Sequence, residues 1–116
     1  MSTYYQDIHP FLFRLGESTR IRTKYPDRIP VLIQRKANSK APFIEKQKYL
    51  VGSDMTVAQL LYSLRKKVKI DPSQALFFFI HEHIPISSSS MQQVYHEHKS
   101  SDGFLYMTYD IENTFG

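Results

Sequence analysis

Cysteine is absent from the 116 residues of this chain. Its absence excludes disulfide bonds, thiolate metal clusters and cysteine nucleophiles, and it favours a reducing, intracellular environment. The first ten residues are polar and lack the apolar stretch of a secretory signal, and the longest strongly apolar run, 75–80, is far too short to span a bilayer. We therefore expect any membrane contact to come from something other than a spanning helix.

Recognisable catalytic motifs are also missing. The sequence contains no glycine-rich phosphate loop, no nucleophile elbow and no evident paired-carboxylate site. Two histidine pairs, His81-Glu82-His83 and His96-Glu97-His98, have their histidines two positions apart, whereas a helical zinc site needs a spacing of four. We interpret them as surface histidines, predict no metal site or cofactor, and regard an enzyme as the least favoured class.

The composition is that of one soluble folded domain, with 41% hydrophobic and 22% charged residues. The net charge of +4 is unevenly distributed, because residues 1–50 carry ten Lys and Arg against four Asp and Glu, whereas residues 51–116 carry five against seven. A basic first half suits nucleic acid, anionic lipid, acidic peptides or simply a solvated face, and charge alone does not choose among them.

Hydrophobic periodicity and start and stop signals predict four helices and four strands. We expect helices at 3–8, 11–24, 57–68 and 90–95, and strands at 29–35, 48–51, 75–80 and 104–109. Thr56 with Gln59 matches a capping box, and Ser90 with Gln93 is a similar helix start. The apolar run 75–80 has the composition of a central strand.

The order of these elements indicates the fold class. Two helices are followed by a strand pair, a crossing helix, a third strand, a short helix and a last strand. Such an order in so short a chain predicts an α+β, ubiquitin-like β-grasp, in which one four-stranded mixed sheet wraps around one main helix and two extra helices stand at the amino terminus.

Several short motifs in register over the whole length make the chain similar to the autophagy ubiquitin-like modifiers, the family of the GABA-receptor-associated protein and its relatives. The motifs are His9-Pro10-Phe11, Lys24-Tyr25-Pro26-Asp27-Arg28-Ile29-Pro30-Val31, Lys48-Tyr49-Leu50-Val51, Ser53-Asp54-Met55-Thr56-Val57, Ala75-Leu76-Phe77-Phe78-Phe79, Phe104-Leu105-Tyr106 and Phe115-Gly116. The resemblance implies one domain over 1–116, with a helical extension (1–24), a β-grasp core (25–112) and a flexible conjugation tail (113–116).

The resemblance also implies that the chain is conjugated through Gly116, with Phe115 contributing to tail recognition. In the family an E1-like enzyme adenylates the glycine carboxylate, E2-like enzymes carry it as a thioester, and it is joined to the amine of phosphatidylethanolamine. A cysteine protease processes and deconjugates such proteins. The free form is then expected in the cytoplasm as a monomer, and the lipidated form on autophagosomes and related vesicles. A terminal glycine alone would not establish this chemistry.

A second implied site is a groove for cargo-receptor peptides that carry an aromatic residue and, three positions later, an aliphatic one. By resemblance, the aromatic side is formed by Glu17, Ile21, Pro30, Lys48, Leu50 and Phe104. The aliphatic side is formed by Tyr25, Val51, Met55, Leu60 and Leu64. Arg28, Lys46 and Lys48 would attract the acidic residues that precede such motifs. Taken singly, Ile21, Leu50 and Phe104 are equally compatible with ordinary core positions.

Two positions depart from the family pattern, since Gly52 replaces a common proline and Ser63 replaces an apolar residue of the second pocket. We expect a shallower or altered aliphatic pocket. Phe77 and Phe79 form a secondary docking surface in relatives, although adjacent aromatic residues in a strand more often serve packing.

Two other functions remain open from sequence. One is a β-grasp peptide-binding module that is never conjugated, and the other is a basic nucleic-acid-binding or microtubule-associated protein. Binding by the latter would weaken steeply with salt, and with the family match we expect no nucleic acid partner.

Overall fold

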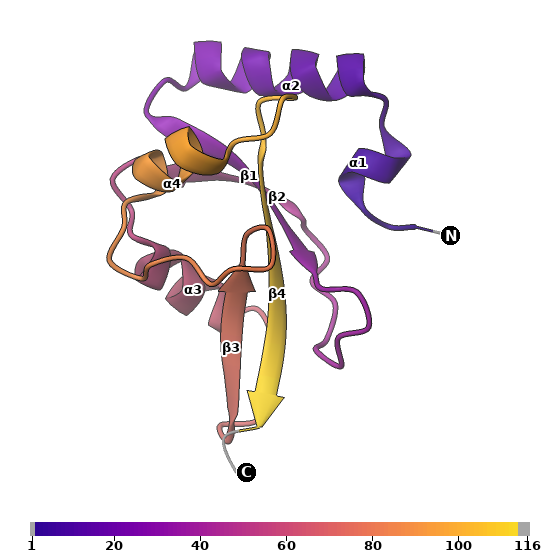
Figure 1. Ribbon diagram of the computed structural model, residues 1–116, viewed down its shortest axis with the longest axis vertical. Coiled ribbons are helices and arrows are strands. Elements are labelled where there is room, and N and C mark those ends of the chain that lie inside the picture. The colour runs from indigo at the N-terminus through magenta and orange to yellow at the C-terminus, as the bar shows by residue number, and fades with distance from the viewer. Residues whose placement is uncertain (1, 114–116) are drawn as a thin grey trace.

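A computed structural model describes residues 2–113 of the protein. Its elements are α1 (Tyr5–Ile8), α2 (Phe11–Lys24), β1 (Arg28–Arg35), β2 (Lys48–Gly52), α3 (Val57–Arg65), β3 (Gln74–Phe79), α4 (Met91–His98) and β4 (Leu105–Asn113). The strands form one sheet in the order β2-β1-β4-β3, in which β1 and β4 are parallel and the other neighbours antiparallel. Figure 1 shows α2 across one end of the molecule, far from the end of β4. The predicted ubiquitin-like β-grasp with amino-terminal helices is confirmed.

Helix α3 begins where its capping box predicts. The Gln59 amide donates to the Thr56 hydroxyl oxygen at 3.1 Å, and the Thr56 amide donates to the Gln59 side-chain oxygen at 2.9 Å. Val57, Leu60 and Leu64 lie on one face and are buried. Helix α3 therefore supplies the apolar stripe that the sheet wraps around.

Helix α2 has the predicted bounds, but its apolar first turns do not enter the core. Only Ser18 and Ile21 are buried, whereas 78% of Leu12 is exposed and Phe11 and Phe13 are also exposed. The first turns stay exposed because α2 covers the sheet only through a short contact near its middle and carboxyl-terminal end.

The prediction that the run 75–80 forms a central strand is wrong, because β3 lies at an edge of the sheet. Leu76 and Phe78 are buried, while Phe77 and Phe79 on the other face are partly exposed, and the Lys36 ammonium lies 4.4 Å from the centre of the Phe79 ring. Aromatic residues on the outer face make an edge strand look continuously apolar. The central positions belong to β1 and β4.

The sheet has apolar packing on both faces. The larger core lies between the sheet, α3 and α4, and contains Ile29, Val31 and Ile33 of β1. The smaller cluster lies on the α2 face and contains Ile21, Leu32 and Phe104. Because strand side chains alternate between faces, β1 contributes to both.

No helix in the described stretch combines the length and the apolar character needed to cross a bilayer.

Candidate functional site

Strand β2 forms an open edge of the sheet, since within residues 2–113 it pairs only with β1. The Ile33 amide donates to the Gln47 carbonyl at 2.8 Å, which identifies these residues as a hydrogen-bonded pair. In an antiparallel ladder hydrogen-bonded and non-hydrogen-bonded pairs alternate. The backbone N–H and C=O groups of Lys48 and Leu50 therefore point away from β1 and toward the open edge.

One side of this edge is the α2 face. Leu50 is partly exposed and packs against the buried cluster that contains Ile21 and Phe104, and Pro30, its partner in the register, is buried. Glu17 of α2 stands at the rim, with its Oε2 3.8 Å from Lys48 Nζ. The residues predicted for the aromatic side thus come together, with Ile21, Pro30 and Phe104 beneath the surface and Leu50 nearest to solvent.

The other side of the edge is the α3 face. Val51, Leu60 and Leu64 are buried in the larger core, and Met55 is partly exposed against it. Tyr25 is exposed at the end of α2, where its carbonyl accepts a hydrogen bond from the Arg28 amide at 3.0 Å. The predicted aliphatic set is therefore mostly core, and Met55 is its accessible member beside β2.

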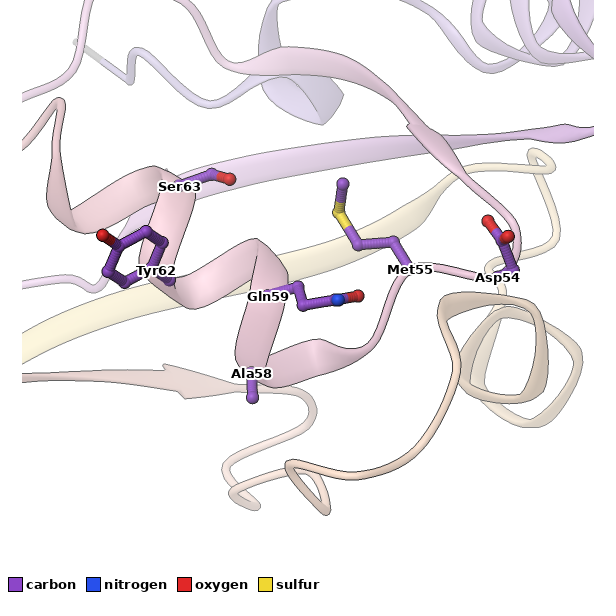
Figure 2. Close-up of a pocket in the computed structure, with 6 residues that line it drawn as sticks. All are labelled: Asp54, Met55, Ala58, Gln59, Tyr62 and Ser63. Carbon is purple, nitrogen blue, oxygen red and sulfur yellow. The ribbon is translucent and has the colours of Figure 1, made fainter.

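Next to Met55 lies an open hollow of about 600 Å³ along α3. Figure 2 shows the residues that line it, which come from α3 and the turn before it. They are Asp54, Met55, Ala58, Gln59, Tyr62 and Ser63. Met55 and Ser63 were named from sequence as residues of the aliphatic side, whereas Asp54, Ala58, Gln59 and Tyr62 were not assigned to a site. The signal for the helical residues is the i, i+4 spacing of Gln59 with Ser63 and of Ala58 with Tyr62, which places each pair on one face of α3.

The two sides lie on opposite faces of the sheet, a geometry that would suit side chains three residues apart. In an extended peptide, residues i and i+3 point to opposite faces of the sheet that the peptide joins. A strand added beside β2 would direct one such side chain toward Leu50 on the α2 face and the other toward Met55 on the α3 face. The outward backbone groups of Lys48 and Leu50 would supply the ladder.

Positive charge borders this edge. Arg28 and Lys46 are exposed at the two ends of β2, and Lys48 is partly exposed within it. Glu17 partly offsets Lys48 and also pairs with Arg20 at 2.5 Å. The edge consequently favours the approach of acidic segments.

Tyr5 is a residue of this region that the sequence did not indicate. Its ring packs against Phe104 with centroids 5.4 Å apart, and Lys48 Nζ lies 5.8 Å from its centroid. Its buried hydroxyl has no hydrogen-bond partner among the described residues, and burial, followed by the charge of Glu17, raises the pKa of this phenol.

The remaining predicted positions lie elsewhere. Phe77 and Phe79 are on β3, at the opposite edge of the sheet from β2, so the structure does not bring them to the groove. His81 and His98 have ring centroids 6.1 Å apart, and residues 2–113 contain no group of three potential metal ligands. Phe115 and Gly116 lie outside the described residues.

The family model described as "Autophagy protein Atg8 ubiquitin like" matches residues 13–116. The chain is 47% identical over 116 residues to Autophagy-related protein 8 of Emericella nidulans, covering all of this chain and 98% of that protein. It is equally similar to that of Coccidioides immitis, at 47% identity with 100% and 99% covered.

Two solved structures have the same fold. A crystal structure of Trypanosoma brucei ATG8 matches with a TM-score of 0.89 at 36% identity, and each chain is covered completely. Plasmodium falciparum Atg8, in complex with a Plasmodium falciparum Atg3 peptide, matches with a TM-score of 0.85 at 33% identity, covering 94% of this chain and 96% of that one.

Proposed function

The chain belongs to the Atg8 family of autophagy ubiquitin-like proteins, and from that premise we propose that it is a lipid-conjugated modifier that also recruits cargo receptors. It is a ubiquitin-like modifier and not an enzyme. The catalytic groups of its conjugation cycle therefore lie on partner enzymes, as expected for a chain without cysteine.

Conjugation would use the carboxyl group of Gly116. An E1-like enzyme adenylates it, E2-like enzymes hold it as a thioester, and the amine of phosphatidylethanolamine then displaces the thiol to form an amide. A cysteine protease would hydrolyse that amide with water, which returns the free Gly116 carboxylate and the lipid amine, and would also cleave off any residues that follow the glycine. Glycine suits this role because it has no side chain to obstruct the nucleophile, and Phe115 before it would be recognised with it.

The conjugated lipid would serve as the membrane anchor. One acyl chain binds a bilayer only marginally, whereas the two chains of a phospholipid hold a protein stably. The unconjugated monomer would be cytoplasmic and the conjugate would reside on autophagosomal and related membranes. The helical extension (1–24) and β-grasp core (25–112) would form the exposed adaptor, with 113–116 as the link.

Peptide recognition rests on one observation, the open β2 edge whose backbone groups at Lys48 and Leu50 face outward between two apolar surfaces. Partners with an aromatic-x-x-aliphatic motif would add a strand there. Cargo receptors are one class of partner, and an E2-like enzyme is a second, which the Atg3 peptide complex of Plasmodium falciparum Atg8 supports. Burial of one aromatic side chain favours binding, whereas the loss of conformational freedom of the peptide opposes it. We therefore expect modest, regulated affinity.

A titration followed by amide chemical shifts tests this site. We expect a peptide with acidic residues before the motif to shift Lys48, Leu50 and Met55 selectively. Replacing either anchor residue of the peptide with alanine should weaken binding about ten-fold or more. Shifts concentrated on β3, or equal affinity for the alanine peptides, would contradict the assignment of the groove to β2.

A further inference from the structure

A second surface of distinctive chemistry lies between the β1–β2 loop and the end of α3. It is a hollow of about 510 Å³, and we refer to it as the basic-aromatic face. Its lining residues are Pro42, Phe43, Ile44, Glu45, Lys46, Tyr49, Lys67 and Lys69. The lining includes three lysines and one carboxylate, and the lysines come from the β1–β2 loop and from the segment after α3, which are distant in sequence.

The cations of this face are available for a partner. Lys67 Nζ lies 4.7 Å and Lys46 Nζ 5.3 Å from the centre of the Tyr49 ring, so both ammonium groups border one aromatic surface. Within the described chain, none of Lys46, Lys67 and Lys69 takes part in a salt bridge. Lys66 continues the positive charge along α3, 4.5 Å from the Tyr62 ring.

An exposed aromatic side chain is held in place beside these lysines. Phe43 is 65% exposed, and its ring is capped by the Arg35 guanidinium at 3.7 Å. Arg35 Nη1 also donates to the carbonyls of Ser39 and Ala41, and the Tyr109 hydroxyl donates to the Pro42 carbonyl at 2.7 Å. Because these hydrogen bonds hold the loop at residues 39–42, directly before Phe43, the exposure of this ring is a property of the folded surface.

The basic-aromatic face adjoins the end of the last strand. The Ser39 hydroxyl donates to Asp110 Oδ1 at 2.6 Å, and residues 38–40 share a hollow with residues 110–113 of β4. Figure 1 shows this loop and the end of β4 in the same half of the molecule, with α2 at the opposite end of its 44 Å length. Gly116 is three positions beyond Asn113 in the sequence, a reach of at most about 10 Å.

We propose that the basic-aromatic face binds anionic phospholipids of the membrane to which Gly116 is joined. The inference rests on the proposed conjugation, which brings this face next to a bilayer. Lysines extend aliphatic stems and place their charge among headgroup phosphates and carboxylates, while an exposed aromatic ring enters the interface. The contact would orient the conjugate so that α2, at the opposite end of the molecule, is directed away from the bilayer.

The test attaches the protein to vesicles without any conjugating enzyme. The chain has no cysteine, so a single cysteine appended after Gly116 couples it to maleimide-bearing phosphatidylethanolamine. It also has no tryptophan, so Phe43→Trp supplies one fluorescent reporter, and Leu12→Trp on exposed α2 supplies a matched reporter at the far end. Vesicles contain brominated lipids as quenchers, with phosphatidylserine or with phosphatidylcholine alone.

We expect the Phe43→Trp reporter to be quenched on phosphatidylserine vesicles and the Leu12→Trp reporter to remain unquenched. Each lysine near an anionic surface raises the equilibrium constant for contact with the bilayer about five-fold. The double change Lys67→Gln with Lys69→Gln should therefore lower this constant on the order of 30-fold. The same charge change at the other end, Lys24→Gln with Lys99→Gln, should have little effect. These two lysine pairs leave Lys46 of the peptide edge intact.

Three results would overturn the proposal. In the first, the Leu12→Trp reporter is quenched and the Phe43→Trp reporter is not. In the second, the Phe43→Trp reporter is quenched equally on neutral vesicles. In the third, neither reporter is quenched, and Lys67 and Lys69 bind a soluble acidic peptide or single-stranded RNA instead. Because the tether is chemical, enzymatic conjugation at Gly116 succeeds or fails independently of this outcome.

Discussion

At Gly103 the backbone before β4 approaches α2 too closely for a side chain. Gly103 has a positive φ of 88°, and a Cβ placed there would lie 2.9 Å from Ser18 Cβ and closer still to its hydroxyl. The buried Ser18 hydroxyl donates to the Asp102 carbonyl at 2.5 Å. This contact joins the helical extension to the β-grasp core.

Gly103→Ala should therefore destabilise the fold by about 2 kcal/mol or more, since the change combines left-handed backbone strain with a clash at Ser18. Gly16→Ala is the matched control, because a Cβ at Gly16 meets nothing within 4 Å on the exposed side of α2. It should stabilise the helix by up to about 1 kcal/mol. Urea unfolding of both variants measures the difference, and equal stabilities would contradict the account.

A network around the buried Asp102 fixes the same junction. Its Oδ2 accepts hydrogen bonds from Arg14 Nη1 at 2.6 Å and from the Tyr106 hydroxyl at 2.5 Å, and its Oδ1 accepts from the Phe104 amide at 2.9 Å. Burial, and then the hydrogen bond to Asp102, raise the pKa of Tyr106 well above its ordinary value of 10.0. The folded protein thus holds this phenol in its protonated form.

Stability should consequently fall as the pH rises above about 10, since the unfolded chain then releases the Tyr106 proton and the folded state retains it. Below that pH the contribution is fully present. Tyr106→Phe should reduce the slope of unfolding free energy against pH by up to about 1.4 kcal/mol per pH unit. Denaturant unfolding between about pH 9 and 11 measures it. An unchanged slope would show that Tyr106 titrates normally in the folded protein.

Helix α3 sets the depth of the aliphatic side. Ser63 is exposed beside the hollow that Met55 and Tyr62 line, so its hydroxyl stands where an apolar surface could meet a ligand. Ser63→Leu should strengthen binding of an aromatic-x-x-aliphatic peptide about three- to ten-fold, through added apolar burial, without changing stability. Ser63→Ala adds no such surface and should leave the affinity near that of the unmodified chain. Calorimetric titration compares them, and an unchanged affinity for Ser63→Leu would count against this role.

Strand β2 allows its register to be tested by alternate proline substitutions. The Lys48 amide faces the open edge, so Lys48→Pro should preserve folding but weaken peptide binding about ten-fold more than Lys48→Ala, which removes only the side chain. The Tyr49 amide faces β1, so Tyr49→Pro removes a ladder bond and should destabilise the fold strongly. Circular dichroism and peptide titration separate the two effects. Equal loss of folding in both proline variants would show that the assigned alternation is wrong.

Local signals explain which elements could be predicted from sequence. The caps at Thr56 and Ser90 depend on residues three apart, and both form the predicted hydrogen bonds. The order of strands depends on pairings between distant residues, such as Val31 with Leu105, so the edge position of β3 was missed. Composition also did not reveal that Leu12 points to solvent, because exposure depends on which part of α2 contacts the sheet.

The candidate site was predictable in part for the same reason. Resemblance supplied residues around β2, and the structure places Leu50 and Met55 on opposite faces of its edge. It did not supply Tyr5 or Tyr62, whose places depend on how α1 and α3 pack. Most residues predicted for the aliphatic side are buried in the larger core. The reason is that apolar side chains of β2 and α3 pack against each other.

The whole molecule has two ends with different chemistry. Helix α2 lies at one end, and the last described residues of β4 lie at the other (Figure 1). Residues 110–113 share a hollow with residues 38–40 of the β1–β2 loop, the loop that also contributes to the basic-aromatic face. The first half of the sequence has the excess of cations, but it does not form the basic-aromatic face alone. Lys46 from the first half lines this hollow together with Lys67 and Lys69 from the second half. The end with the basic-aromatic face is therefore suited to face a membrane, while α2 at the other end would stay clear of it.

The central claim is that Gly116 is the point of attachment. We predict that incubation with ATP, active E1-like and E2-like enzymes of the family and phosphatidylethanolamine liposomes will raise the mass of the chain by one lipid less one water, as measured by mass spectrometry. Deletion of Gly116 should abolish this increase. No adduct on the full chain, with the same enzymes active on another family member, would contradict the modifier assignment and leave the β2 edge as the basis of its function.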